Sequence, residues 1–216
     1  MKLLKSNYIA YKFIKKYLMP LKKDLLVNQE TDIVIEGYPR SGNTYAVLAF
    51  QMFNENTKVA HHLHVPAQLN GAVKFAIPAL ILIRKPEEAI KSLLIRAPKY
   101  TLDVAINEYI NFYNIVLKNK QYLLICDFKE IVNHFDSVIK KLNNKYNKNF
   151  NVFINSTENN QIIMEKIKYL SENIDSKVGK KGIAMPTSEK EKMKKEMVID
   201  VRKFHICKKI YEECLQ

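Results

Sequence analysis

A short segment of the sequence has the spacing of a phosphate-binding loop but lacks its usual lysine. The segment GYPRSGNTY covers residues 37–45. Gly37 and Gly42 fit the Walker A pattern G-x-x-x-x-G-K-[ST], and Thr44 occupies its hydroxyl position. Asn43 stands where the lysine is expected. Backbone amides of a glycine-rich turn, aided by the dipole of the following helix, bind a phosphate without a lysine. We therefore expect a phosphate site here, with an ordinary strand-to-helix turn as the alternative.

A second candidate group follows another apolar run. In ATP and GTP enzymes a strand-end aspartate helps to hold magnesium, whereas the apolar run 79–83 ends in Arg84. Arg40 in the loop and Arg84 at this strand end are two cations that can neutralise an anionic ligand. The pair predicts a phosphate-bearing ligand that binds without a metal ion.

Strands and helices alternate around these residues. Short apolar or β-branched runs predict strands, and apolar positions at helical spacing predict helices. Continuous apolar strands that alternate with helices indicate a parallel sheet covered on both faces. We therefore predict a three-layer, P-loop-like α/β fold with a central parallel β-sheet flanked by helices. The expected strands are 32–36, 79–83 and 122–126, and the expected helices are 41–54, 87–96, 103–119 and 130–142.

The remaining segments extend this core at both ends. The asparagine-rich segment 145–160 predicts an irregular connection, and the tail predicts a basic loop, a charged helix from Ser188 and a final helix. A chain of 216 residues is long enough to bury a substantial core. We expect one domain over residues 1–216, with a basic N-terminal helical segment over 1–30 and an α/β core with C-terminal helices over 31–216.

Charge and cysteine content restrict partners and compartment. The formal net charge of +13 favours nucleic acid, anionic lipid, nucleotides or an acidic polysaccharide or protein as partners. The cysteines, at positions 126, 207 and 214, show no C-x-x-C spacing, so a reducing cytoplasm is favoured over a disulfide framework or a zinc site. Residues 1–20 have the pattern of a basic amphipathic helix. Peripheral contact with a membrane surface is one interpretation, and packing on the protein's own domain is the one we favour.

Two motifs together resemble the PAPS-dependent sulfotransferase family. The segment 38–45 is similar to the family's 5′-phosphosulfate loop, P-[KR]-S-G-[TN]-T followed by an aromatic residue. RKPEEAIKS, residues 84–92, is similar to its 3′-phosphate motif, R-x-P-x-[DE]-x-x-x-S. The resemblance covers residues 31–135 well. Segment 127–131 differs in two charges from the family's R-Y-E-D-L, and the chain has no tryptophan for the late cofactor loop.

This resemblance implies PAPS as the sulfuryl donor, PAP as the product and no metal. It implies that the amides of Gly42 and Asn43 and the hydroxyl of Thr44 bind the 5′-phosphate. Arg40 would stabilise the bridging oxygen as the S–O bond breaks. The remaining cofactor residues would be Ser41 in the loop, Arg84 and Ser92 at the 3′-phosphate, Tyr45 against adenine or in the core, and Lys181 and Gly182 at the start of the late loop.

A general base for the acceptor's proton is expected among three histidines. His64 stands in the H-x-P context in which the family commonly carries its base, so the resemblance favours His64. His62 is the alternative, because on an extended strand it would face the same side as His64. His61 is expected to be a polar strand residue. A zinc site is disfavoured because no carboxylate or cysteine accompanies the histidines in the sequence.

Two other functional classes stay open. A nucleotide kinase or other NTPase would use the loop for ATP and Asp127 as a metal ligand, although Asn43 and Arg84 argue against it. A noncatalytic nucleic-acid-binding protein would explain the charge, but recognised binding motifs are missing and no nucleic acid is expected. The acceptor is open between a hydroxyl and an amine, with a carbohydrate or another anionic molecule favoured by the positive charge.

Overall fold

The fold is a four-stranded parallel sheet between two layers of helices. The computed structural model describes residues 6–17, 25–174 and 188–216. The strand order is β2-β1-β3-β4, and all neighbouring strands are parallel. The strands are β1 (Ile33–Gly37), β2 (Val59–His61), β3 (Ala79–Ile83) and β4 (Leu124–Asp127). The predicted parallel α/β sheet is confirmed.

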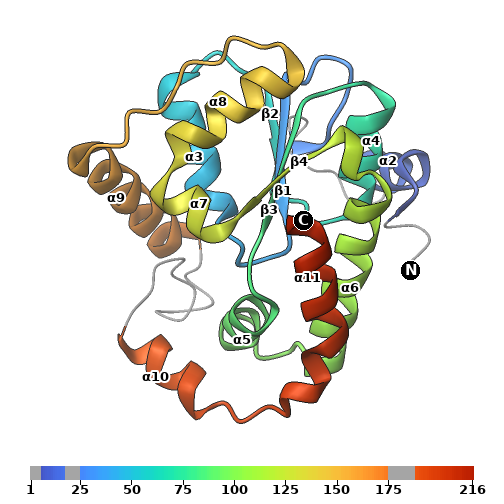
Figure 1. The fold of residues 1–216 in the computed structure, drawn as a ribbon, viewed down its shortest axis with the longest axis vertical. Coiled ribbons are helices and arrows are strands. Elements are labelled where there is room, and N and C mark those ends of the chain that lie inside the picture. Colours follow the sequence, from blue (N-terminus) through green and yellow to red (C-terminus); the bar gives the residue numbers. More distant parts are fainter. Residues whose placement is uncertain (1–5, 18–24, 175–187) are drawn as a thin grey trace.

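Helices cover both faces of this sheet (Figure 1). One face is covered by α3 (Asn43–Phe53), α7 (Phe128–Asn133), α8 (Phe135–Tyr146) and α9 (Thr157–Ile174). The other face is covered by α4 (Pro66–Lys74), α6 (Leu102–Lys118) and α11 (His205–Leu215). Below the sheet in Figure 1 lie α5 (Pro86–Arg96) and α10 (Ser188–Glu196). Two short 3-10 helices span Lys120–Tyr122 and Val201–Phe204.

Two apolar cores explain why the strands are apolar throughout. Alternate residues of a strand face opposite sides of the sheet. Accordingly, Val34 and Ile81 belong to the core under α4, α6 and α11, whereas Ile35 and Leu80 belong to the core under α3 and α8. Each of these four side chains is fully buried. Both faces of the sheet therefore need apolar residues, as in other parallel sheets with two covered faces.

The N-terminal helix α2 (Tyr8–Tyr17) packs on the protein itself. Tyr8 and Tyr11 are buried, and the Tyr8 hydroxyl donates a 2.8 Å hydrogen bond to the Val27 carbonyl. An added Cβ on Gly71 of α4 would meet the Tyr8 ring at 2.7 Å, so α2 and α4 need glycine there to approach closely. Contact of this helix with a membrane stays a prediction. None of the helices in the described part of the chain is long and apolar enough to cross a bilayer.

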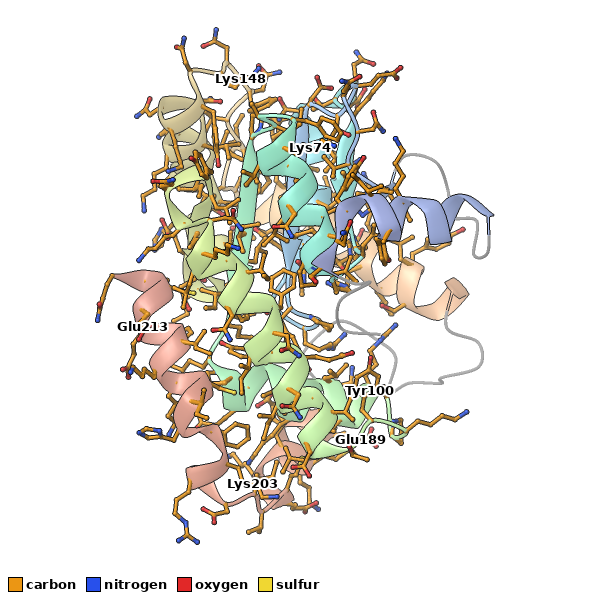
Figure 2. All side chains as sticks on the ribbon, turned by 90° about the vertical axis from the view of Figure 1, so that its right-hand side faces the viewer. Lys74, Tyr100, Lys148, Glu189, Lys203 and Glu213 are labelled. Atoms are coloured by element: carbon orange, nitrogen blue, oxygen red, sulfur yellow. The ribbon has the colours of Figure 1, made fainter. Side chains whose placement is uncertain are left out.

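Charged side chains are spread over the molecular surface. In Figure 2, Lys148 and Lys203 lie at opposite ends of the molecule, and both are exposed. The net charge of +13 is therefore not confined to the ends of the strands where the candidate site lies.

Three local predictions need correction. The expected helix 130–142 consists of two helices, because α7 ends at Asn133 and α8 begins at Phe135. The expected irregular segment 145–160 is irregular only over 147–156, because α8 ends at Tyr146 and α9 begins at Thr157. The final helix is expected from the apolar positions 198, 201, 204, 206, 210 and 211, but α11 begins only at His205, after the 3-10 turn Val201–Phe204.

Candidate active site

The two sequence motifs lie at the topological switch point of the sheet. The chain passes from β1 to β2 on one side and then to β3 on the other side of β1. The carboxyl ends of β1 and β3 are therefore adjacent, and helical connections leave them toward opposite faces. Open α/β sheets bind ligands in the crevice at such a point. The loop after β1 and Arg84 after β3 both lie there.

The loop after β1 needs glycine at both glycine positions of the Walker A pattern, Gly37 and Gly42. Gly42 has a φ of 92°, in the left-handed region that favours glycine, and forms the N-cap of α3. An added Cβ on Gly37 would lie 2.4 Å from the Leu82 carbonyl oxygen. Arg40 also has a positive φ, of 70°, which is uncommon for a residue with a side chain. The loop is a strained turn rather than an ordinary connection, and such strain is concentrated at functional sites.

Asn43 supports the loop from inside, at the position of the missing lysine. Its Nδ2 donates a 3.1 Å hydrogen bond to the Tyr38 carbonyl, and only 4% of the residue is exposed. Its Oδ1 is buried and has no hydrogen-bond donor among the residues that the structure describes. An acceptor oxygen does not bind a phosphate oxygen, so the side chain is not the anion ligand. The main-chain amides at the start of α3 are the available donors.

Tyrosines of α6 fasten the loop and the end of β3. The Tyr113 hydroxyl donates to the Leu82 carbonyl at 2.8 Å and accepts from the Tyr38 amide at 3.3 Å. The Ser41 hydroxyl, which is fully buried, lies 3.5 Å from the same Tyr113 oxygen. Ser41 therefore faces the protein with its side chain. The Tyr109 hydroxyl donates to the Arg84 carbonyl at 2.9 Å. Burial raises the pKa of Tyr113, so its hydroxyl stays protonated and can donate.

The structure brings the two motifs into direct contact. Arg40 Nε donates a 3.0 Å hydrogen bond to Ser92 Oγ on α5. Arg84 Nη1 donates a 3.1 Å hydrogen bond to the Arg40 carbonyl, and its Nη2 lies 3.2 Å from a Glu88 carboxylate oxygen. The Arg84 guanidinium also lies 4.2 Å from the centre of the Phe128 ring, which holds its plane in place. Two cations and one hydroxyl from both motifs thus form one cluster.

The histidines lie beside the loop, but not on an extended strand. β2 ends at His61, and both His62 and His64 have positive φ, 58° and 52°. The expectation of a strand through these residues is therefore wrong. Their rings are nevertheless neighbours, with centroids 5.8 Å apart.

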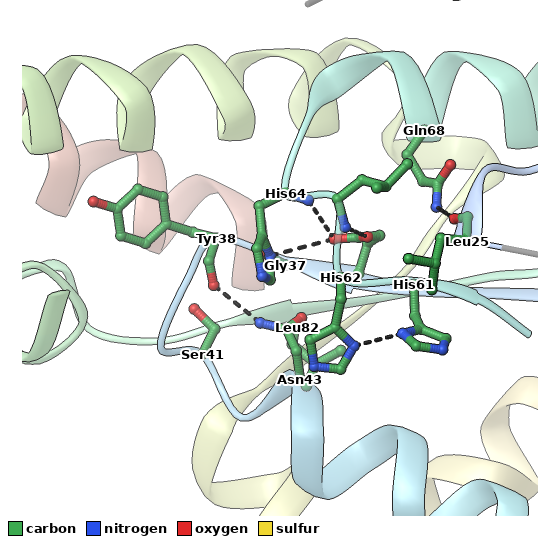
Figure 3. A network of polar contacts seen from close by, with 12 residues as sticks. Leu25, Gly37, Tyr38, Ser41, Asn43, His61, His62, His64, Gln68 and Leu82 are labelled. Atoms are coloured by element: carbon green, nitrogen blue, oxygen red, sulfur yellow. Dashed lines mark hydrogen bonds and ion pairs between the residues drawn. The ribbon is translucent and has the colours of Figure 1, made fainter. Parts of the chain in front are cut away.

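His62 is bonded through both ring nitrogens. Its Nε2 lies 3.1 Å from Thr44 Oγ1, and its Nδ1 lies 2.6 Å from His61 Nδ1 (Figure 3). Burial, followed by the neighbouring His61 and His64, lowers the pKa of His62 to about 4. His62 is therefore neutral at physiological pH. Its contact with Thr44 links the histidine loop, residues 62–65, to the phosphate loop, residues 37–45.

His64 is held by β1. Its Nδ1 lies 2.7 Å from the Gly37 carbonyl oxygen and 3.5 Å from Glu36 Oε2. Burial alone would lower the pKa of His64, but the hydrogen bond and charge of Glu36 outweigh burial, and the pKa is raised. One quarter of the His64 side chain is exposed, so the ring reaches solvent.

Glu36 and Lys190 are site residues that the sequence analysis missed. Glu36 is fully buried at the end of β1, and a carboxylate inside an apolar strand is a signal that the sequence already carries. Lys190 of α10 is 7% exposed, and burial followed by the charges of Arg40 and Arg96 lowers its pKa to about 8. Lys190 therefore adds a third cation near Arg40, from a helix distant in sequence.

Of three further predicted residues, one packs in the core and two lie outside the described part of the chain. Tyr45 is 8% exposed, packs edge-on against Phe135 and donates a 2.6 Å hydrogen bond to Asn160 Oδ1. Its place is that of a core tyrosine, and its contact with adenine stays a prediction. Lys181 and Gly182 lie outside the described residues.

Comparison with known proteins finds a likeness only among solved structures. No protein-family model matches the chain. No curated protein matches it either. Among solved structures, mouse sulfotransferase SULT7A1 complexed with PAP is similar, at 11% identity and a TM-score of 0.46, over 86% of this chain and 91% of that one. A likeness at this level carries no argument about function, so the assignment of the site rests on its own geometry.

Proposed function

We propose that this protein is a PAPS-dependent sulfotransferase, which moves a sulfuryl group from PAPS to a hydroxyl or amine acceptor and releases PAP. The contact between Arg40 and Ser92, with Arg84 beside them, carries this proposal. The two motifs that resemble the family's 5′- and 3′-phosphate motifs are 52 residues apart at this contact, yet they form one cationic cluster at the switch point. Such a cluster suits a nucleotide with phosphates at both ends of its ribose.

The residues present fit this donor. The amides at the start of α3 and the Thr44 hydroxyl would hold the 5′-phosphate, and Arg84 with Ser92 would hold the 3′-phosphate. Arg40 would stabilise the negative charge that gathers on the bridging oxygen. PAPS supplies the sulfuryl group when bound, and this group carries less negative charge than a phosphoryl group. Transfer therefore needs less metal assistance, in keeping with Asn43 and Arg84 at positions where an ATP enzyme has a lysine and a carboxylate.

His64 would act as the general base. The acceptor oxygen forms a bond to sulfur with a lone pair as the bond between sulfur and the bridging oxygen breaks. That electron pair stays on the phosphate, and the acceptor's proton goes to His64. His62 is less suited to this role, because both of its ring nitrogens are bonded and its pKa is lowered to about 4. A base whose pKa is near or above neutrality accepts a proton more readily.

The kinase alternative finds little support around Asp127. The strands next to β1 are β2, which ends at His61, and β3, which ends before Arg84. Asp127 lies at the end of β4, one strand further away. Its carboxylate already accepts hydrogen bonds from the Tyr211 hydroxyl at 2.6 Å and from the Lys129 amide at 2.9 Å. Each oxygen of this carboxylate therefore already has a hydrogen-bond donor within the protein.

The proposal is tested by following PAP release from PAPS with a panel of acceptors in the presence of EDTA. The panel should contain neutral and anionic saccharides, phenols and amines, because the acceptor class is open. We expect PAP release that depends on one acceptor class and on Arg84. PAP binding that is absent in wild-type protein, with transfer of phosphate from Mg-ATP instead, would contradict the proposal.

A further inference from the structure

A buried carboxylate lies directly behind the proposed base. Glu36 is the fourth residue of β1, immediately before Gly37 of the phosphate loop, and none of its surface is exposed. A buried carboxylate is costly unless it is charged and fully bonded, or neutral. The bonds that Glu36 makes therefore indicate its role.

Glu36 holds the histidine loop by its main chain. Its Oε1 accepts a 2.7 Å hydrogen bond from the Leu63 amide, and its Oε2 accepts a 3.1 Å bond from the His64 amide. These two bonds fix the loop between the two residues with positive φ, His62 and His64. Burial would raise the pKa of Glu36, but the hydrogen bond and charge of His64 and the Leu63 amide outweigh it, so the pKa is lowered and the carboxylate is charged.

The Gly37 carbonyl and the Glu36 carboxylate together determine which nitrogen of His64 carries the proton. The two groups nearest to His64 Nδ1 are the Gly37 carbonyl at 2.7 Å and Glu36 Oε2 at 3.5 Å. Both are acceptors, since Glu36 is charged, so Nδ1 must be the donor and carry hydrogen. In the neutral ring the lone pair then lies on Nε2. A negative charge behind Nδ1 also stabilises the imidazolium that forms when Nε2 takes up a proton.

We propose that Glu36 is a positioning residue that acts through His64: together with the Gly37 carbonyl its carboxylate keeps Nδ1 protonated and leaves Nε2 to take the acceptor's proton, and its charge stabilises the imidazolium that then forms. This inference rests on the proposed function for the identity of the reaction, but the tautomer and the pairing do not depend on it. Among the described residues, the other titratable groups around the pair are His61 at the end of β2, His62 in the loop and Tyr11 on α2. Burial, followed by the charge of Glu36, raises the pKa of Tyr11, so this hydroxyl stays neutral.

The test is NMR of the histidine ring nitrogens across a pH titration, in protein labelled with ¹⁵N-histidine. The chain has five histidines, and a His64→Gln variant assigns the signals of His64. In wild-type protein we expect a protonated Nδ1, a bare Nε2 and a titration midpoint above 6.5. In Glu36→Gln, which keeps the length of the side chain but removes its charge, the midpoint should fall by roughly one to three units. Glu30→Gln, which removes an exposed carboxylate paired with Lys58, should leave the midpoint unchanged.

Kinetics supply the second measurement. The acid limb of the rate of sulfuryl transfer should move to lower pH in Glu36→Gln, while PAP affinity stays within about twofold of wild type because Glu36 contributes no proposed phosphate ligand. A His64 that carries its proton on Nε2, or a midpoint that Glu36→Gln does not move, would overturn the inference. If Glu36→Gln fails to fold, the titration midpoint of His64 in wild-type protein still decides, because a midpoint at or below 6.5 would show that Glu36 does not raise the pKa of His64. A failure of PAP binding would remove the proposed function but leave the His64 result standing.

Discussion

Arg40 Nε donates a 3.0 Å hydrogen bond to Ser92 Oγ, and this bond joins the loop after β1 to the helix after β3. Ser92 is 8% exposed, so the bond is largely shielded from water. The arginine that is proposed to face the bridging oxygen is thus oriented by the serine that is proposed to face the 3′-phosphate. One side-chain contact would therefore couple binding of the 5′-phosphate end of the nucleotide to binding of its 3′-phosphate.

This relationship predicts energetic coupling between the two residues. In a double-mutant cycle of Arg40→Ala and Ser92→Ala, PAP affinities should be non-additive, with a coupling of roughly 0.5–3 kcal/mol, because each change disturbs the other residue's geometry. Isothermal titration of wild type, both single variants and the double variant provides the measurement. Additive effects within about 0.5 kcal/mol would show that the contact has no role in binding.

Arg84 is predicted to recognise the 3′-phosphate. Arg84→Ala removes a charge-assisted hydrogen bond, so PAP affinity should fall by roughly 1.5–3 kcal/mol. The affinity for AMP, which lacks the 3′-phosphate, should change much less. Arg202→Ala is the matched control, since Arg202 is an exposed arginine paired with Asp200 far along the chain. Equal losses for PAP and AMP would place the 3′-phosphate elsewhere.

His64 is predicted to be the base. His64→Ala should lower turnover by about 10²–10⁴-fold while PAP affinity is retained, because a general base contributes to the chemical step rather than to binding of the nucleotide. His62→Ala should cost much less. If His62→Ala is the more damaging change at saturating acceptor, the base is His62. If neither change matters, another group accepts the proton.

The pH dependence of the rate follows from the raised pKa of His64. Only the neutral ring accepts a proton, so the rate should rise with pH through an ionisation above the ordinary histidine value of 6.5. The measurement is kcat between pH 5.5 and 9, with the free enzyme checked for folding at each pH. A rate that stays constant across this range would instead indicate His62, whose pKa is lowered to about 4, so that its ring is already neutral at pH 5.5.

The pH dependence of stability tests the same cluster by a different route. The pKa values of His61 and His62 are lowered by burial, so their unfolded forms take up protons more readily. Their contribution to the free energy of unfolding is complete above pH 6.5 and is lost as the pH falls below it, toward about 4 in the case of His62. The slope approaches about 1.4 kcal/mol per pH unit for each proton taken up.

The pH range in which His61 and His62 change the free energy of unfolding is separate from the ranges in which Glu36 and His64 change it. Glu36, with a lowered pKa, loses its contribution only below its ordinary value of 4.5 as pH falls. His64, with a raised pKa, loses its contribution as pH rises above 6.5. Denaturant unfolding between pH 4.5 and 6.5 should therefore show a shallower slope in His62→Gln than in wild type. Identical slopes would contradict the burial of a neutral His62.

Most of the fold was predictable because its signals are local. The apolar run 79–83 matches β3 residue for residue, and the run 122–126 overlaps β4. The errors occurred where tertiary packing decides. A continuous helical pattern does not show that the chain turns at His134. Helix α9 was missed because its first residues are polar and asparagine-rich and its buried residues, which include Ile163 and Ile167, form only a narrow stripe.

The site was predictable in its motifs and not in its geometry. The sequence predicted the cation pair Arg40 and Arg84, because each follows a recognisable strand. It did not predict the turn at His62 and His64, because the group that holds that loop is Glu36, 28 residues before His64. Likewise Tyr113 supports the phosphate loop from 75 residues away, and no local pattern connects the two.

The most direct test of the account is binding of PAP without metal. In EDTA, the melting temperature of wild-type protein should rise with PAP concentration, since a ligand that binds only the folded state stabilises it by about 2.7 kcal/mol at 100 times its Kd. AMP should stabilise less than PAP, because it lacks the 3′-phosphate, and the difference should vanish in Arg84→Ala. Stabilisation by Mg-ATP with none by PAP would contradict the central claim.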